Sequence, residues 1–324
     1  MEKELRIGII GPGHIANKMA STIKRAKGFC NYAVASRSKD KAEAFKAEYG
    51  FEKAYGSYEA MLQDKDVDLV YIATPHSCHY EQMLLCLKYN KPVLCEKSLT
   101  TSLKDTQDIY KKFEEKNLFI SEALWTSFLP SRDYINKVLY ENKKIGEIKE
   151  MTASFKVPLM HKERVTSRAL GGGVLMDIGI YPVTFVFRTL GFDYTSYDIN
   201  NIVYRDGVDI KEELTFNYKN GAKGVCKVDG TSKLSLVVTI VGEKGKMSID
   251  MVNCPNLITT SKHGLLTSIK WTKPKLGGFE YELYAAKKAI EEGRYECAEW
   301  THQNSIDMAK IIEDIFNSKE AQNQ

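Results

Sequence analysis

The sequence predicts an α/β protein with two domains. Over the first 120 residues, short apolar segments alternate with helical patterns, which indicates a doubly wound parallel sheet. From residue 148 onward, longer alternating segments are separated by tight turns, which indicates an α+β domain with an open, mostly antiparallel sheet. The 324 residues suit two domains of ordinary size, and we expect them to be residues 1–123 and 124–324.

In the N-terminal domain, the expected strands are short and fully apolar, as a sheet covered on both faces requires. They are Leu5–Ile10, Tyr32–Ala35, Leu69–Ile72, Val93–Cys95 and Phe119–Glu122. The patterns between them predict helices over Ile15–Lys27, Lys39–Tyr49, Ser57–Gln63, Tyr80–Tyr89 and Ser102–Lys116.

In the C-terminal domain, a helix over Arg132–Tyr140 is expected to precede the second sheet. Strands are expected over Ile148–Val157, Asp198–Tyr204, Asp209–Tyr218, Ala222–Asp229, Leu234–Val241 and Lys246–Asp250. Glycine-containing turns at 205–207, 219–221 and 243–245 predict hairpins between several of them. Further helices are expected near Gly179–Leu190, Tyr281–Glu292 and His302–Phe316, and residues 320–324 are expected to fray.

The first strand ends in the turn GPGHIA at residues 11–16, and a helical pattern follows. Here the first glycine allows a tight turn, the second lets the backbone approach a pyrophosphate, and alanine lets the helix pack closely on the sheet. The N–H groups at the start of the helix would face the phosphates. We therefore predict a Rossmann dinucleotide site that contains Gly11, Gly13, His14, Ile15 and Ala16.

The second strand ends in Ser36-Arg37-Ser38-Lys39 and not in the acidic residue that is typical of NAD sites. A carboxylate would repel a 2′-phosphate, whereas a hydroxyl and a guanidinium can bind it. Ser36 and Arg37 therefore favour NADP(H) over NAD(H). The alternative is that Arg37 and Lys39 are a solvated surface pair.

Ligands of open α/β sheets bind beyond the carboxyl ends of the strands, where this chain places polar residues. Lys97 directly follows a buried strand, although a lysine at a strand end can also simply extend into solvent. The predicted cofactor-binding residues of these loops are Thr74, Pro75, His76, His79, Glu96 and Lys97. His76 and His79 form an HxxH pair without a third ligand at a recognisable spacing, so we predict no metal site.

A second group of candidates follows three glycines at 171–173. Asp177 and Tyr181 are four residues apart, so one helical turn would place carboxylate and phenol on the same face. With Lys97 opposite, they would supply a proton donor, a cation that lowers its pKa and an orienting carboxylate. Asp177 could instead cap a helix. Trp125, Phe155 and Phe279 could form an apolar substrate wall or be core aromatics.

Composition excludes several function classes. The net charge of +4 is mild and opposite charges are interspersed, so we expect neither nucleic acid nor an anionic membrane as a partner. The apolar stretches have strand length, and the charged N-terminus is unlike a signal peptide. The seven cysteines lack zinc-like spacing and suggest reduced thiols in the cytoplasm.

These motifs, in this order, resemble the glucose–fructose oxidoreductase and inositol dehydrogenase (Gfo/Idh/MocA) family. The matching segments are GPGHIA at 11–16, ATPHSCHYE at 73–81, CEKSL at 95–99, EALWTSFLP at 122–130 and GGGVLMDIGIYPV at 171–183. Tyr181, where inositol dehydrogenases carry histidine, and the Ser36-Arg37 pair resemble the dimeric dihydrodiol dehydrogenase branch. Ser98 departs from the family pattern, which has proline after the lysine.

The resemblance implies that Lys97 and Tyr181 are the catalytic pair, with NADP(H) as cofactor. It also implies a homodimer or homotetramer that associates through the open face of the second sheet. We therefore expect hydride transfer between the nicotinamide and a carbonyl or secondary alcohol of a sugar-like, polyol or diol substrate. The alternatives are a catalytically weak NADP(H)-binding regulator and an NAD-dependent glycosidase of the same fold.

Overall fold

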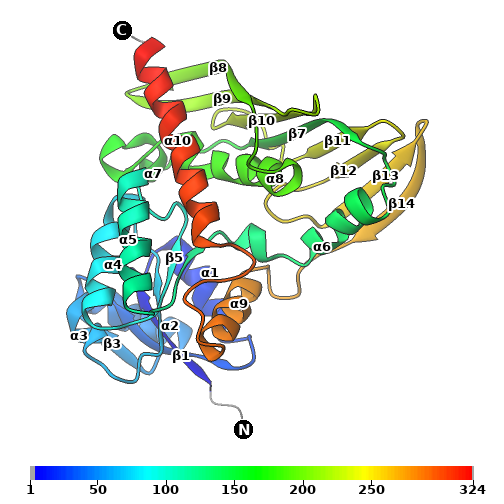
Figure 1. Cartoon of the computed structure of the whole chain (residues 1–324). Coiled ribbons are helices and arrows are strands. Elements are labelled where there is room, and N and C mark those ends of the chain that lie inside the picture. Colours follow the sequence, from blue (N-terminus) through cyan, green and yellow to red (C-terminus); the bar gives the residue numbers. More distant parts are fainter. Residues whose placement is uncertain (1–3, 323–324) are drawn as a thin grey trace. The chain divides into compact units, whose positions relative to one another are not determined.

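The computed structural model describes residues 4–322, which form two compact units (Figure 1). The first unit contains the chain up to Phe128 together with Lys275–Glu313. The second contains Leu129–Pro274 and the chain from Asp314 onward. The expected fold class, a parallel α/β sheet followed by a mostly antiparallel one, is confirmed.

The first unit is built on a six-stranded parallel sheet in the order β3-β2-β1-β4-β5-β6, which is the doubly wound order. Its strands are β1 (Leu5–Ile10), β2 (Phe29–Ala35), β3 (Lys53–Tyr55), β4 (Leu69–Ile72), β5 (Val93–Glu96) and β6 (Ile120–Ala123). All but β3 were predicted to within a few residues. β3 was missed because three residues are too few to show a period.

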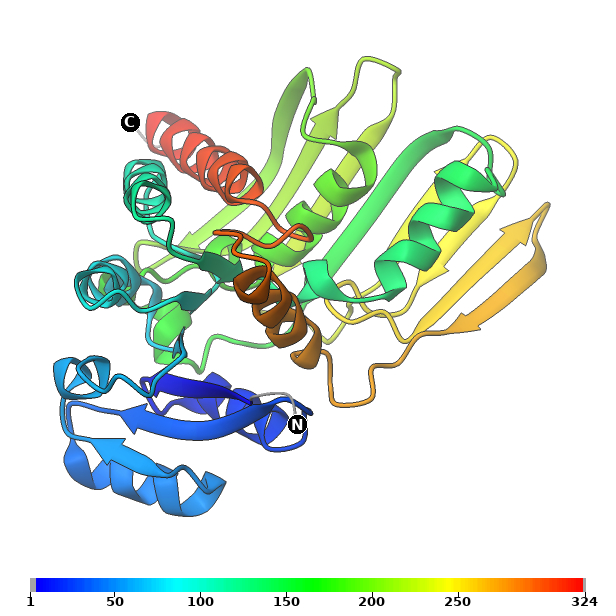
Figure 2. The ribbon, with the colours of Figure 1, turned by 60° about the horizontal axis from the view of Figure 1, so that its bottom comes forward.

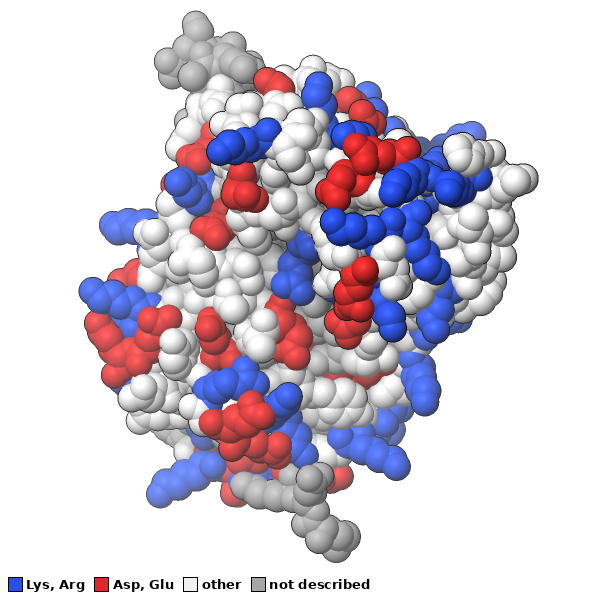
Figure 3. Space-filling view, turned by 45° about the vertical axis from the view of Figure 1, so that its right-hand side comes forward, with Lys and Arg blue, Asp and Glu red and all other residues white. Residues whose placement is uncertain are grey.

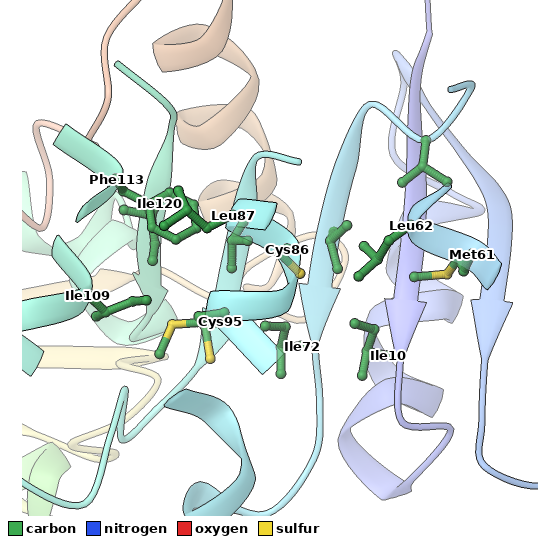
Figure 4. Close-up of a cluster of buried hydrophobic side chains, with 14 of the residues drawn as sticks. Ile10, Met61, Leu62, Ile72, Cys86, Leu87, Cys95, Ile109, Phe113 and Ile120 are labelled. Atoms are coloured by element: carbon green, nitrogen blue, oxygen red, sulfur yellow. The ribbon is translucent and has the colours of Figure 1, made fainter. Parts of the chain in front are cut away.

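Helices connect these strands, as predicted. They are α1 (His14–Ile23), α2 (Lys39–Tyr49), α3 (Tyr58–Leu62), α4 (His79–Lys88) and α5 (Leu103–Glu115). Two 3₁₀ turns that were not predicted are η1 (His76–Cys78), before α4, and η2 (Trp125–Phe128), after β6. Apolar side chains of the central strands pack against α3, α4 and α5, and this layer buries Ile10, Met61, Leu62, Ile72, Cys86, Leu87, Cys95, Ile109, Phe113 and Ile120 (Figure 4). Their removal from water supplies the main driving force for this layer.

The C-terminal segment 275–313 adds α9 (Glu280–Glu291) and the beginning of α10 (His302–Gln322) to the first unit. The ring of Tyr284 lies 5.5 Å from that of Phe29, and Trp300 Nε1 donates to Glu122 at 3.0 Å. This division differs from the expected one, in which the whole chain after residue 123 formed the second domain. The reason is that contacts made after residue 274 return the chain to the first sheet, which sequence periodicity does not reveal.

The second unit is built on an eight-stranded sheet in the order β14-β13-β12-β11-β7-β10-β9-β8, in which only β7 and β10 pair in parallel. Its strands are β7 (Ile148–Lys156), β8 (Ser196–Arg205), β9 (Val208–Asn217), β10 (Lys223–Asp229), β11 (Val238–Gly242), β12 (Lys246–Ile249), β13 (Leu257–Lys262) and β14 (Leu265–Trp271). The three predicted hairpin turns are confirmed. β13 and β14 were both missed. β14 is mostly exposed on both faces and shows no alternation.

Helices of the second unit lie across one face of this sheet, as Figure 2 shows for α6 and α8. The helical segments are α6 (Ser131–Asn136), η3 (Lys137–Glu141), α7 (Glu163–Thr166), η4 (Arg168–Leu170), η5 (Leu175–Gly179) and α8 (Ile180–Leu190). Both η3 and η5 are π-helical turns. Figure 3 shows basic and acidic side chains interspersed over the face that it draws.

One helical stretch among the described residues, Arg168–Leu190, is long and apolar enough to cross a membrane, with a mean hydropathy of 1.6. This differs from the expectation that apolar stretches have only strand length. However, 78% of its apolar window is buried, because α8 packs on β7 and β10. A helix that is apolar on all sides is typical of a protein core as well as of a membrane.

Candidate active site

The turn after β1 has the geometry that its glycines predict. Gly11 has φ +88°, and a Cβ there would lie 2.6 Å from Thr74 Cγ2. At Gly13, in contrast, an added Cβ would meet only Ala73 O at 3.9 Å. Gly11 is thus fixed by backbone conformation and packing, whereas Gly13 leaves space beside the turn for a ligand.

The start of α1 is suited to an anion. Gly13 precedes the helix without a side-chain cap, and the first turn carries no acidic residue. The positive end of the helix dipole and the N–H groups of this turn are therefore not neutralised by a capping side chain. Ala16 is fully buried, as close packing of the helix requires. These features fit a pyrophosphate at the predicted place.

Polar and basic side chains follow the end of β2. Ser36 is buried and its Oγ accepts the N–H of Ser38 at 3.2 Å. Lys39 forms an ion pair with Glu43 at 2.9 Å. Arg37 is exposed, and within residues 4–322 its guanidinium has no hydrogen-bond partner. Arg37, and not Lys39, is therefore the cation available to a phosphate at this edge.

His79 connects the loops that follow β4 and β5. Its ring is fully buried, with Nε2 at 2.8 Å from Thr74 O and Nδ1 at 3.0 Å from Ser98 O. Burial lowers the pKa of His79. His79 therefore acts on the two loops through their backbones, while His76, whose ring centroid is 5.8 Å away, is only partly buried.

β5 ends at Glu96, the following loop carries Lys97 and Ser98, and the Lys97–Ser98 peptide bond is cis. Burial raises the pKa of Glu96, whose carboxylate accepts from the Tyr71 hydroxyl and, at 3.3 Å, from the Lys97 N–H. Farther along, the N–H of Leu99 donates to Glu122 at 3.0 Å. The backbone on both sides of Lys97 is thus held by buried carboxylates, while the lysine side chain is itself only half-buried.

Two of the three aromatic residues that could form an apolar substrate wall lie together. Trp125 and Phe279 stack in the first unit with ring centroids 4.8 Å apart. Phe155 belongs to the second unit and stacks on Tyr181 at 5.4 Å. All four rings are at most 9% exposed, so their faces are covered mainly by one another and by the core.

Asp177 and Tyr181 lie in the second unit, at the start of its central helix. Asp177 falls within the π-helical turn η5, and Tyr181 falls in the first turn of α8. The expectation that Asp177 and Tyr181 lie on the same helix face assumed a regular α-helix. A π-helical turn contains more residues, so residues four apart are not aligned as they would be in an α-helix. Asp177 is not the N-cap residue of this segment, which is Val174, and its carboxylate accepts Nε and Nη2 of Arg164 at 3.2 and 2.8 Å.

The glycines before this helix serve packing within the unit. A Cβ on Gly172 would lie 2.7 Å from Ser167 O, and one on Gly173 would lie 2.2 Å from Asp209 Oδ1. Asp209 is 1% exposed and accepts the N–H of Leu175 at 2.7 Å. The close neighbours of Gly172 and Gly173 therefore belong to other segments of the same unit. Sequence reasoning missed Arg164 and Asp209, because neither belongs to a motif that signals a contact with this helix.

Comparison with known proteins shows the family to which the chain belongs. Residues 5–123 match the oxidoreductase family with an NAD-binding Rossmann fold, and residues 137–248 match the C-terminal domain of the same GFO/IDH/MocA family. The chain belongs to this family of oxidoreductases.

Several relatives are dehydrogenases. The trans-1,2-dihydrobenzene-1,2-diol dehydrogenase of Mus musculus is 32% identical over 78% of this chain and 76% of its own length. The protein of that name from Danio rerio is 29% identical over 96% and 95%.

Solved structures share the fold. A 3-ketoreductase from Actinomadura kijaniata in complex with NADP and TDP-benzene has a TM-score of 0.85 and 24% identity, covering 96% of both chains. An aldose–aldose oxidoreductase from Caulobacter crescentus has a TM-score of 0.88 and 19% identity, covering 99% and 98%.

Proposed function

We propose that this protein is an NADP(H)-dependent dehydrogenase that transfers hydride between the nicotinamide and the carbonyl or secondary alcohol of a sugar-like, polyol or diol substrate. The observation that carries the cofactor assignment is the end of β2, where Arg37 is exposed without a hydrogen-bond partner among the described residues and residues 36–39 contain no carboxylate. The 3-ketoreductase of similar fold was solved with NADP, which supports the assignment.

The residues of the chain have separate roles in this proposal. When bound, the cofactor supplies the hydride at its nicotinamide ring. Tyr181 gives a proton to the carbonyl oxygen during reduction or takes it from the alcohol during oxidation. Because a phenol has a pKa of about 10, the Lys97 ammonium is needed to make Tyr181 competent near neutral pH.

Asp177 is part of the same proposal, as a group that orients Lys97 or binds a substrate hydroxyl. Its ion pair with Arg164 places a second charged group at the start of the central helix. Trp125 and Phe279 in one unit, and Phe155 in the other, are the proposed apolar contacts of the substrate. The substrate is thus expected to combine an apolar part with hydroxyl groups.

Exchange of Arg37 tests the cofactor assignment. Arg37→Asp is expected to raise the KM for NADPH at least about tenfold and to shift preference toward NADH, because it removes one charge-assisted contact. Lys39→Ala is the matched control, since Lys39 already pairs with Glu43 and should leave the preference unchanged. Unchanged kinetics with both cofactors in Arg37→Asp would refute the 2′-phosphate site.

A substrate screen separates the dehydrogenase from the alternative of an NADP(H)-binding regulator. Tight NADPH binding by the wild-type protein without turnover of any ketose, inosose or dicarbonyl would favour the regulator.

We also propose a homodimer or homotetramer through the open face of the second sheet. Lys270 lies over the Tyr134 ring of α6, so its neighbours in the strand, Ile269 and Trp271, are on the opposite face of the sheet. They are 55% and 70% exposed, which is unusual for large apolar side chains and typical of interfaces. A monomeric mass in solution would contradict this proposal.

The expected cytoplasmic location stays a prediction, in keeping with seven free cysteines.

A further inference from the structure

One carboxyl group of the first unit is buried without a hydrogen-bond partner. Glu282 on α9 is 0% exposed, and neither of its carboxyl oxygens has a hydrogen-bond partner in the part of the chain that the structure describes. Two residues earlier, Glu280 is also buried, but its carboxylate accepts the N–H groups of Leu276 at 3.0 Å and Gly278 at 2.7 Å. The helix thus presents one carboxylate that the backbone stabilises and one that nothing stabilises. A buried carboxyl in the second situation favours its neutral form.

The groups around Glu282 offer no positive charge to compensate an anion. Its ionisable neighbours are Tyr71 on β4, Glu96 at the end of β5 and Cys297 before α10. Burial raises the pKa of Glu282 strongly, and repulsion from Glu96 raises it further. The two carboxyl groups therefore oppose each other's ionisation.

The hydrogen bonds decide which of the two carries the charge. Glu96 accepts from the Tyr71 hydroxyl through Oε1 and from the Lys97 N–H through Oε2, whereas Glu282 accepts from neither. Donors that point at a carboxylate stabilise its ionised form. The neighbouring Lys97 also lowers the pKa of Glu96 by its charge, against the larger effect of burial. The negative charge therefore belongs on Glu96.

We propose that Glu96 and Glu282 hold a single proton between them, with the proton on Glu282 and the negative charge on Glu96. This places the charge directly before Lys97 in the chain, where it favours the ammonium form of the lysine. That consequence rests on the proposed dehydrogenase function. Glu282 is then a positioning residue, which touches neither cofactor nor substrate but fixes the charge state of the segment that presents Lys97.

Infrared spectroscopy tests the location of the proton without any substrate. A buried protonated carboxyl gives a C=O stretching band that a carboxylate lacks. We expect this band in the wild-type protein near neutral pH, its loss in Glu282→Gln, and its disappearance from the wild type as the pH is raised. Absence of the band near neutral pH, or its persistence in Glu282→Gln, would overturn the proposal.

The pH dependence of stability gives a second test. A carboxyl whose pKa is raised by folding contributes stability that is fully present below about pH 4.3 and is lost as the pH rises toward and through the raised value. The melting midpoint should therefore fall less between about pH 5 and pH 8 in Glu282→Gln than in the wild type. Glu280→Gln is the control for removal of a buried carboxylate, and we expect it to lower the melting midpoint because it weakens the hydrogen bonds from Leu276 and Gly278. Equal slopes in the wild type and Glu282→Gln would contradict a neutral Glu282.

Kinetics separate this inference from the proposed function. Glu282→Gln keeps a neutral group of the same shape, so kcat and the KM for NADPH should stay within about twofold of the wild type. A large loss of kcat with an unchanged KM would mean that the charge on Glu282 is required, and would overturn the inference. If neither protein turns over any substrate, the proposed function fails, while the infrared band and the melting slopes still decide the state of Glu282.

Discussion

Gly173→Ala should disturb the start of the helix that carries Asp177 and Tyr181. Gly173 has φ +116°, which an L-residue rarely adopts, and an added Cβ would lie 2.2 Å from Asp209 Oδ1. Because this contact is far too short, Asp209 has to move. Its other oxygen, Oδ2, accepts the N–H of Leu175 at 2.7 Å, and we expect displacement of the carboxylate to break this buried hydrogen bond.

Two contributions set the size of the effect. The positive φ costs an L-residue roughly 1–2 kcal/mol. Loss of a hydrogen bond to a buried charged group costs roughly 1.5–3 kcal/mol more. We therefore expect Gly173→Ala to lower the free energy of unfolding by about 2.5–5 kcal/mol.

Gly207→Ala is the matched control, because Gly207 has φ +79° and no atom within 4 Å of an added Cβ. It should cost only the backbone contribution. With about 2–4 °C per kcal/mol for a unit of this size, the melting midpoint of Gly173→Ala should lie about 3–12 °C below that of Gly207→Ala. Circular dichroism melting curves measure both. Equal midpoints in the two variants would refute the reasoning, because they would show that Asp209 makes no stabilising contact here.

Two further predictions concern the proton donor and acid stability. Tyr181→Phe should abolish turnover while keeping the dissociation constant for NADPH, because the ring still stacks on Phe155 but the hydroxyl is gone. Nicotinamide absorbance measures turnover, and titration with NADPH measures the dissociation constant. A fully active variant would mean that another residue is the proton donor. Burial raises the pKa of Asp64, but hydrogen bonds from Lys53 and Tyr55 hold it well below its usual range. Such a group stabilises the fold above about pH 4 and less below it, so Asp64→Asn should lower the melting midpoint at neutral pH and lose this effect in acid. An equal effect at both pH values would contradict the ion pair.

The candidate site could be predicted where its residues belong to local patterns. The turn at Gly11 and Gly13 and the polar end of β2 follow from a strand, a break and a helix in direct succession. Local propensity could not show that Asp177 lies in a π turn, and in the tertiary structure this turn packs against β9 and β10. The partners of this helix, Arg164 and Asp209, are likewise set by tertiary contacts between distant segments.

The same distinction applies to the whole chain. The sequence by itself determined the order of strands and helices, the hairpins and the class of cofactor site, because hydrophobic period and turn chemistry act over a few residues. Only the tertiary structure decided that residues 275–313 return to the first sheet and that Glu282 is buried beside Glu96 without a donor. Burial and charge at such positions depend on which distant segments pack against each other, and a local sequence pattern does not show that packing.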